Sequence, residues 1–208
     1  MNKPLIHDVI STENKSIPLF GNKFLDFFTR VKWYVPLIIF VPVIALLLLK
    51  HIQVAPVSFA FTVLLVVGGL VFWTISEYLI HRFVFHYEPK TEKMREIFFT
   101  FHGVHHAYPN DSLRLVMPPM MSIPLAIVFI YIFYLVFHQW AFAFGAGFFI
   151  GYLAYDMLHY ATHHSRSKNR FFKKLKEHHM LHHHKHPNKG FGVTSDFWDM
   201  AFRTKFED

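Results

Sequence analysis

Residues 115–155, LVMPPMMSIPLAIVFIYIFYLVFHQWAFAFGAGFFIGYLAY, form a run of 41 residues without a charged side chain. A helix crosses the hydrocarbon core of a bilayer with about 20 apolar residues, so this run is too long for one crossing. The polar pair His138 and Gln139 divides it near its middle. The run therefore predicts two membrane-spanning helices, over 120–137 and 140–158.

Two further uncharged runs precede it in the chain. They contain 17 and 26 residues and predict spans over 33–50 and 54–77. The alternative is a soluble protein with buried core helices, but such helices carry a polar stripe and these runs have none. We therefore expect an all-α integral membrane protein with four transmembrane helices.

The composition excludes several other classes. The chain has 208 residues, of which 53% are hydrophobic, 19% aromatic and 17% charged, whereas disordered chains are polar and poor in aromatic residues. The absence of cysteine excludes a disulfide scaffold, a cysteine-ligated zinc finger, an iron–sulfur cluster and a cysteine nucleophile.

The positions of the basic residues, which give the chain its net charge of +7, indicate its membrane topology. Of the 21 Lys and Arg residues, all except Lys50 fall on one side of the four predicted spans. Because positive residues concentrate in cytoplasmic loops, we expect both termini and the loop between the second and third spans to be cytoplasmic. Residues 1–32 would form a cytoplasmic N-terminal segment without a cleavable signal peptide, and 33–208 a membrane-embedded domain. The host would be a bacterial inner membrane or the endoplasmic reticulum, and no nucleic-acid partner is expected.

The chain contains 17 histidines, and ten of them form four clusters on the predicted cytoplasmic side. On a helix, residues three or four apart share a face, so three of the clusters each direct their imidazoles to one side. His81 and His86 are five apart, about 140° on an ideal helix, so this pair requires the helix to end or bend. The ten are His81, His86, His102, His105, His106, His159, His163, His179, His182 and His183.

Ten imidazoles would supply two metal ions with five nitrogen ligands each. One cluster alone would be an ordinary surface feature, and the C-terminal run alone could be a loose metal-buffering tail. Imidazole suits iron, zinc, copper or nickel. A closed structural zinc needs only four ligands, so ten favour a paired catalytic centre in a helical cytoplasmic cap.

Other polar residues near these clusters have predicted roles. Glu77 and Asp156 precede ligand histidines by four and three residues, and each could accept a hydrogen bond from one, unless it simply meets water. Three basic residues could hold a carboxylate or phosphate headgroup, although each also fits the topology signal: Arg82, Arg114 and Lys189. Residues 165–176 alternate basic and apolar side chains, as in an interfacial helix, with a solvated loop as the alternative.

Four segments resemble the fatty acid hydroxylase superfamily, and most of all the fatty acid 2-hydroxylases. They are WTISEYLIHRFVFHYEP (73–89), FHGVHHAYPNDSLRLVMPP (101–119), GYLAYDMLHYATHHS (151–165) and EHHMLHHHKHPNKGFGVTSDFWDMAF (177–202). The resemblance implies a dimetal membrane oxygenase, with iron as the metal and zinc able to replace it in purified protein. It would use O₂ and two electrons to hydroxylate C2 of a fatty acyl chain, free or in sphingolipid.

The resemblance also implies a division of the ten ligands. One metal would take His81, His86, His102, His106 and His183, and the other His105, His159, His163, His179 and His182. Family members often carry a cytochrome b5 domain with a His-Pro-Gly-Gly motif, which this sequence lacks. We therefore expect no haem domain in this chain and a separate electron donor, such as cytochrome b5 or ferredoxin with a reductase.

Two other functions remain open at this point. Relatives with similar histidine motifs act on sterols or carotenoids as hydroxylases or desaturases. A histidine-rich metal transporter is a more distant alternative, because transporters place polar ligands near the bilayer midplane and these spans carry none there.

Overall fold

The computed structural model describes residues 10–206, and every regular element within them is a helix. Lys3, His7 and part of the predicted N-terminal segment lie outside the described residues. The elements are α1 (Lys23–Phe27), α2 (Val35–Val54), α3 (Phe59–Leu79), the π-helical η1 (Ile80–Phe85), α4 (Glu92–Phe98), the π-helical η2 (Phe99–Gly103), α5 (Val104–Ala107), α6 (Pro119–Phe137), the 3₁₀ turn η3 (His138–Trp140), α7 (Ala141–His164), α8 (Arg170–His184) and α9 (Phe197–Ala201).

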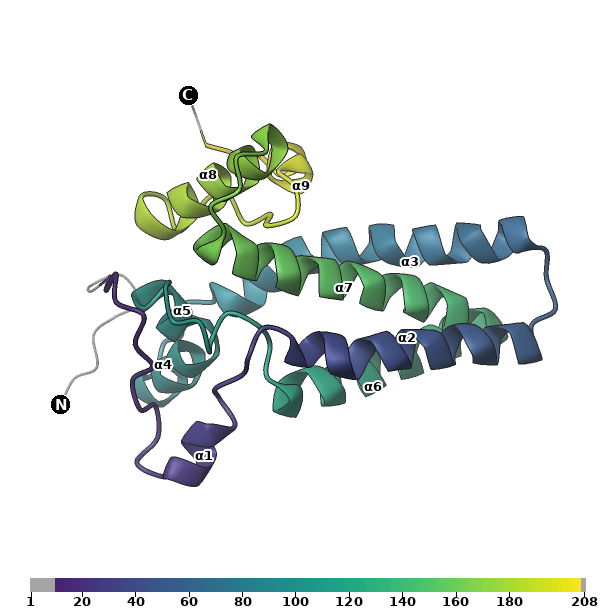
Figure 1. Cartoon of the computed structure of the whole chain (residues 1–208), viewed down its shortest axis with the longest axis horizontal. Coiled ribbons are helices and arrows are strands. Elements are labelled where there is room, and N and C mark those ends of the chain that lie inside the picture. The colour runs from purple at the N-terminus through teal and green to yellow at the C-terminus, as the bar shows by residue number, and fades with distance from the viewer. Residues whose placement is uncertain (1–9, 207–208) are drawn as a thin grey trace.

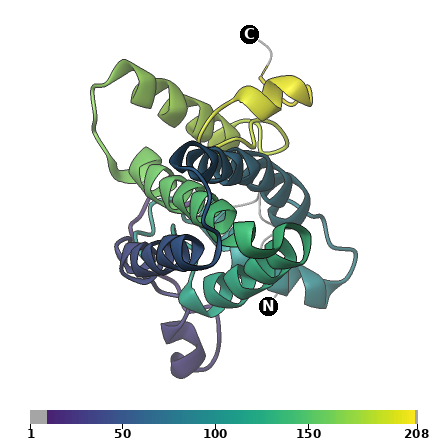
Figure 2. The same cartoon turned by 90° about the vertical axis from the view of Figure 1, so that its right-hand side faces the viewer.

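Four long helices, α2, α3, α6 and α7, run along the longest axis of the molecule, and the short helices gather at one end (Figure 1). Figure 2 shows the long helices end-on from the side opposite the short ones. Within residues 10–206, three segments are long and apolar enough to cross a membrane: Val35–Val54, Phe59–Phe85 and Pro119–His164. The third has 46 residues and contains both α6 and α7.

The chain reverses between α6 and α7 at η3. His138 has φ 50° and ψ −126°, and the two helices then pack against each other. The predicted division of the long uncharged run is thus where the structure turns. The other predicted boundaries lie within about five residues of the observed ones, except that α7 continues six residues past 158 and so carries His159 and His163.

Helices α3 and α7 pack extensively against each other, and glycines line their contact. A Cβ atom added at Gly69 would lie 1.9 Å from the carbonyl oxygen of Phe144, and one at Gly147 would lie 1.9 Å from that of Val66. Small residues permit this backbone approach, which is how helices associate in a lipid environment that offers no hydrophobic driving force.

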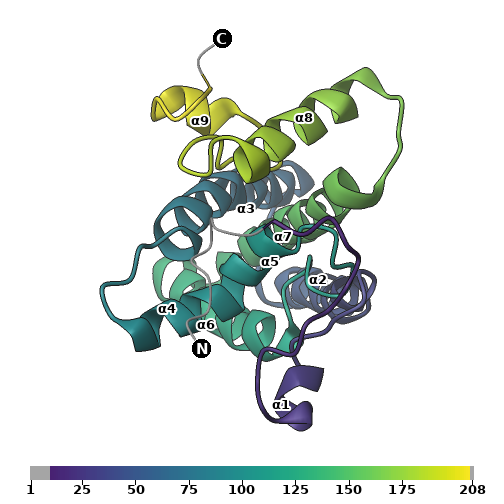
Figure 3. The same ribbon diagram turned by 90° about the vertical axis from the view of Figure 1, so that its left-hand side faces the viewer.

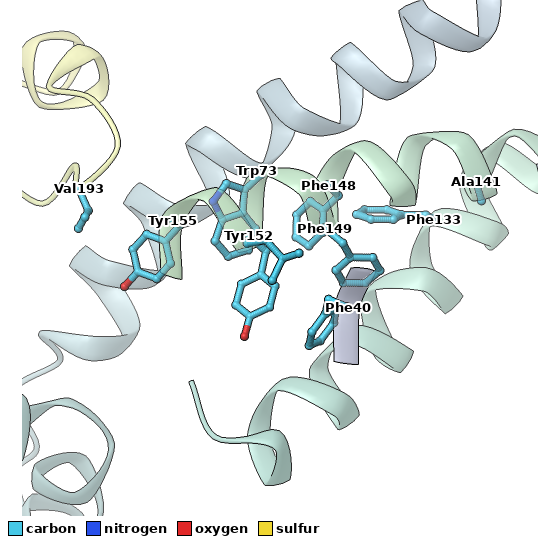
Figure 4. Packing of buried hydrophobic residues seen from close by; sticks show 10 residues of the cluster. Phe40, Trp73, Phe133, Ala141, Phe148, Phe149, Tyr152, Tyr155 and Val193 are labelled. Atoms are coloured by element: carbon cyan, nitrogen blue, oxygen red, sulfur yellow. The ribbon is translucent and has the colours of Figure 1, made fainter. Parts of the chain in front are cut away.

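Aromatic side chains fill the space beside this contact (Figure 4). The ring centroid of Trp73 lies 5.0 Å from that of Phe148 and 5.4 Å from that of Tyr152, and Phe40 reaches Tyr152 at 4.9 Å. Most large apolar side chains on the outer faces of these helices are exposed, as expected for surfaces that meet lipid. The bundle thus provides a rigid base for the short helices at its end.

Helix α8 joins the predicted interfacial segment to the last histidine cluster. It begins at Arg170, where the Asn169 side chain accepts hydrogen bonds from the N–H groups of Phe171 and Phe172. Phe171 and Leu175 lie on the same face four residues apart, and Phe171 is exposed while Leu175 is buried, so the first turn of this face projects beyond the part that packs on the molecule. An interfacial position for this helix therefore stays a prediction.

Candidate metal centre

Ten histidines lie close together at the end of the bundle that carries the short helices. Figure 3 shows the ribbon from this end, with the short helices gathered around the ends of α3 and α7. Nine of the ten histidines lie in η1, η2, α5, α7 and α8, and His86 directly follows η1; eight of the ten side chains are buried. They form two groups, in each of which the ligand nitrogens lie within 4.8 Å of one another. The first histidine group is His81, His86, His102, His106 and His182. The second histidine group is His105, His159, His163, His179 and His183.

A π-helical turn brings His81 and His86 together. In η1 the backbone N–H of His86 donates to the carbonyl of His81, five residues back, at 3.1 Å. The wider turn removes most of the 140° that would separate them on an α-helix, and their ring centroids lie 4.9 Å apart. The sequence required a bend or an end here, and the structure supplies a π-helix.

Nε2 atoms face one another in the first histidine group. His102 Nε2 lies 3.2 Å from that of His81 and 3.0 Å from that of His106, and the Nε2 atoms of His86 and His182 are 3.1 Å apart. Two Nε2 atoms this close cannot both carry a proton, so at least one Nε2 of each pair presents its lone pair. The lone pairs therefore converge as they would on a shared cation.

The second histidine group repeats this arrangement. The Nε2 atoms of His105 and His159 are 2.9 Å apart, and His179 Nε2 lies 2.9 Å from that of His163 and 3.1 Å from that of His183. Nitrogens bound to one ion at about 2.1 Å lie within roughly 4.2 Å of each other, close to the observed spread. Both groups therefore fit a metal ion in donor type, number and spacing.

The division implied by the resemblance is wrong for two adjacent residues. His182 belongs to the first histidine group and His183 to the second. Neighbouring side chains on α8 point about 100° apart, and the structure directs His182 toward His86 while His183 approaches His179. Spacing alone shows that both face the site, and only the packing of α8 shows which group each joins.

Burial keeps these imidazoles neutral, which is the form that binds metals. Burial lowers the pKa of His182 to about 3, and repulsion from His81 acts in the same direction. Burial, with smaller contributions from neighbouring histidines, also holds the pKa of five others well below the ordinary value: His102, His105, His106, His179 and His183.

Backbone carbonyls, and not the two predicted carboxylates, hold the first histidine group from behind. Nδ1 of His81 donates to the carbonyl of Phe191 at 2.5 Å, and Nδ1 of His182 donates to that of Lys189 at 2.8 Å. Glu77 was expected to accept from a histidine but instead accepts from the N–H groups of Val193 and Thr194.

Asp156 also has a different partner from the one expected. It accepts a hydrogen bond from the backbone N–H of Met117 at 3.4 Å, and no hydrogen bond joins it to a histidine within residues 10–206. Asp199, which the sequence did not single out, is fully buried and accepts from Phe191, Gly192, Thr204 and His178. Its place in the FWD motif beside the glycine-rich GFGVT stretch was the available signal.

A cavity of about 230 Å³ reaches both histidine groups. Its wall includes His102 of the first group together with His105 and His159 of the second. The rest of the wall is mainly apolar and comes from the chain around α1, from η1, η2 and α5, from the segment before α6, and from α6 and α7. A chain-like apolar ligand in this cavity would lie beside both groups.

Arg114 lines this cavity, but its charge is already paired. Its guanidinium lies 3.4 Å from a carboxylate oxygen of Asp26 and 3.6 Å from one of Asp111. It also donates to the hydroxyl of Thr29. Arg114 therefore fastens the N-terminal segment to the loop before α6, which leaves its predicted role with a headgroup without support.

The fold and the site define a class: a helical protein with candidate membrane spans and two histidine groups that could each hold a metal ion. Residues 66–204 match the fatty acid hydroxylase family model, and the chain belongs to this family.

The similarity extends to named relatives. The ceramide very long chain fatty acid hydroxylase of Schizosaccharomyces pombe is 39% identical over 91% of this chain and 55% of its own length. A dihydroceramide fatty acyl 2-hydroxylase of Arabidopsis thaliana is 34% identical over 96% of this chain and 84% of its own. The chain thus spans little more than half of the fission-yeast relative.

A solved structure has the same fold. The structure of full-length scs7p, in which only the hydroxylase domain is visible, superposes with a TM-score of 0.89 at 36% identity. The match covers 97% of this chain and 76% of that one. The bundle and the short helices at its end are therefore a shared architecture.

Proposed function

We propose that this protein is a membrane monooxygenase that hydroxylates C2 of a fatty acyl chain, free or in a sphingolipid. The observation that carries the proposal is the apolar cavity whose wall contains histidines of both groups. The ten histidines would hold two metal ions, with iron as the native metal. The names of the relatives, which refer to fatty acyl and ceramide substrates, support acyl lipids over sterols or carotenoids.

The chemistry supplied by the metals, when bound, is the activation of O₂ with two electrons from a separate donor. One oxygen atom enters the C–H bond as a hydroxyl, and the other leaves as water with two protons. The protein's own residues contribute by positioning the acyl chain. Phe85, Phe101 and Met121 form part of the apolar cavity wall that would hold the acyl chain beside His102 and His105 and exclude water.

The proposed topology has four crossings, with α6 and α7 as separate spans. The histidine groups and both ends of the chain would face the cytoplasm, with residues 1–32 outside the bilayer and 33–208 forming the embedded domain. Lys50 lies near the α2–α3 connection, at the end of the bundle away from the short helices (Figure 1). The basic residues gathered at the other end support this orientation.

The test is expression in a host that lacks hydroxylated lipids, followed by mass spectrometry of its fatty acids, ceramides and sterols. We expect new acyl species with a hydroxyl at C2 and unchanged sterols. Hydroxylation at another carbon, or of sterols alone, would contradict the proposal. Metal translocation into vesicles without any oxygenated lipid would favour a transporter instead.

A further inference from the structure

The segment 189–194, here called the glycine loop, lies between α8 and α9, and two of its carbonyls accept hydrogen bonds from members of the first histidine group. The carbonyl of Phe191 accepts from His81, and that of Lys189 accepts from His182. A carbonyl oxygen can only accept, so both rings carry their proton on Nδ1. Their Nε2 lone pairs are therefore free to face the centre of the group.

Two buried carboxylates hold the glycine loop in this position. Asp199 accepts from the N–H groups of Phe191 and Gly192, each at 2.8 Å. Glu77 accepts from the next two N–H groups along the chain, those of Val193 and Thr194, at 2.8 and 2.9 Å. Four consecutive backbone donors are thus fixed by two carboxylates, one from α9 and one from α3.

The second histidine group has less support, because the one backbone partner recorded for its described residues is Leu115, beside His159. Its Nδ1 atoms lack a hydrogen-bond partner in the part of the chain that the structure describes at four positions: His105, His163, His179 and His183. Partners behind ligand histidines fix the ring and its tautomer, and their loss commonly lowers metal affinity about 10- to 100-fold. The two histidine groups therefore differ in the hydrogen bonds that support their rings.

We propose that Asp199 and Glu77 are positioning residues for one of the two metal sites, acting through the glycine loop. The first histidine group would hold its metal more tightly than the second, and only its affinity would depend on the loop. This inference rests on the proposed function, in which each histidine group binds one metal.

The experiment loads the full chain in detergent with Zn²⁺ and follows its release to a coloured chelator. We expect two metals per wild-type chain, released in a fast and a slow phase. His182→Ala should remove the slow phase and His179→Ala the fast one, which assigns each phase to a group.

Asp199→Asn should then accelerate the slow phase about 10- to 100-fold and leave the fast phase unchanged. Asp196→Asn is the matched control. Asp196 lies three residues earlier and pairs with Lys174 and Lys205 instead of the loop, so neither phase should change. If Asp199→Asn does not fold, Glu77→Gln tests the same prediction from α3.

A general loss of structure would accelerate both phases together, so equal acceleration would overturn the inference. Release of both wild-type metals at one rate would overturn it as well, while leaving the proposed function intact. A chain that binds fewer than two metals would overturn both.

Discussion

Adjacent histidines on α8 belong to different histidine groups, so a substitution at either position removes a candidate ligand from one group and not from the other. His182 and His183 join the first and second groups, while His184, the next residue, is exposed. Eight of the ten grouped histidines could be found from helical spacing, which places each cluster on one face, whereas His81 and His86 stood out only as a pair that an ideal helix would separate. Their division into two groups could not be predicted from spacing. It depends on the orientation of α8 about its own axis relative to α5 and α7, and no local sequence pattern encodes that orientation.

Glu77 provides a prediction about stability. Glu77→Ala should destabilise the protein by roughly 3 kcal/mol, because it leaves the N–H groups of Val193 and Thr194 and the Thr194 hydroxyl without their acceptor. Denaturant unfolding in detergent would measure the change. Glu96→Ala, at an exposed position on α4, should have little effect, and equal losses for both would contradict this role.

The buried histidines predict that the metal-free protein is sensitive to acid. An unfolded histidine binds a proton near pH 6.5, whereas the pKa of folded His182 is about 3. As the pH falls below about 6.5 the unfolded chain binds more protons than the folded one, so stability decreases progressively toward pH 3. The denaturant midpoint for unfolding of protein treated with a chelator should be lower at pH 5 than at pH 8, and an unchanged midpoint would contradict the prediction.

Among the elements, the long helices could be predicted from sequence and the π-helical turns could not. Uncharged runs locate the long helices to within a few residues because the cost of burying charge in lipid limits where each can end. The segment Ile80–Phe85 has no compositional signal for π-helix, and only the five-residue spacing of its histidines indicated an irregularity. Similarly, the carbonyls of the glycine loop carry no side-chain signature.

The α3–α7 contact makes a prediction from two neighbouring glycines. Gly69→Ala should destabilise the bundle by several kcal/mol, because its Cβ would lie 1.9 Å from the carbonyl oxygen of Phe144. Gly68→Ala has the same gain in helix propensity, but its Cβ would meet only the Phe144 ring at 3.6 Å. Thermal unfolding should separate the two variants, and equal midpoints would contradict the proposed close packing.

For the whole molecule, the cavity connects the membrane-facing bundle to the histidine groups. Met121→Trp on α6 should fill part of the cavity and reduce hydroxylation about tenfold, with unchanged metal content, because the acyl chain would lose its position while the ligands remain. Ile127→Trp lies on the same helix at a side chain that is 66% exposed, and should retain activity. A Met121→Trp variant that loses metal along with activity would contradict this separation of roles.

The orientation of the molecule was inferred from charge alone, since basic residues mark one side of the spans. The different structures at the two ends of the helical bundle could not be predicted from charge. The short helices owe their arrangement to contacts between segments far apart in sequence, such as Glu77 with Thr194 and His86 with His182. Such long-range contacts create the site.

The most direct test of the central claim is to supply ¹⁸O₂ to cells that express the protein in a host without 2-hydroxylated lipids. The account predicts one ¹⁸O atom in the C2 hydroxyl of acyl lipids for the wild type and for His184→Ala. It predicts a loss of more than about a hundredfold for His105→Ala, which removes a member of the second histidine group. Unlabelled hydroxyl groups, or undiminished product from His105→Ala, would contradict it.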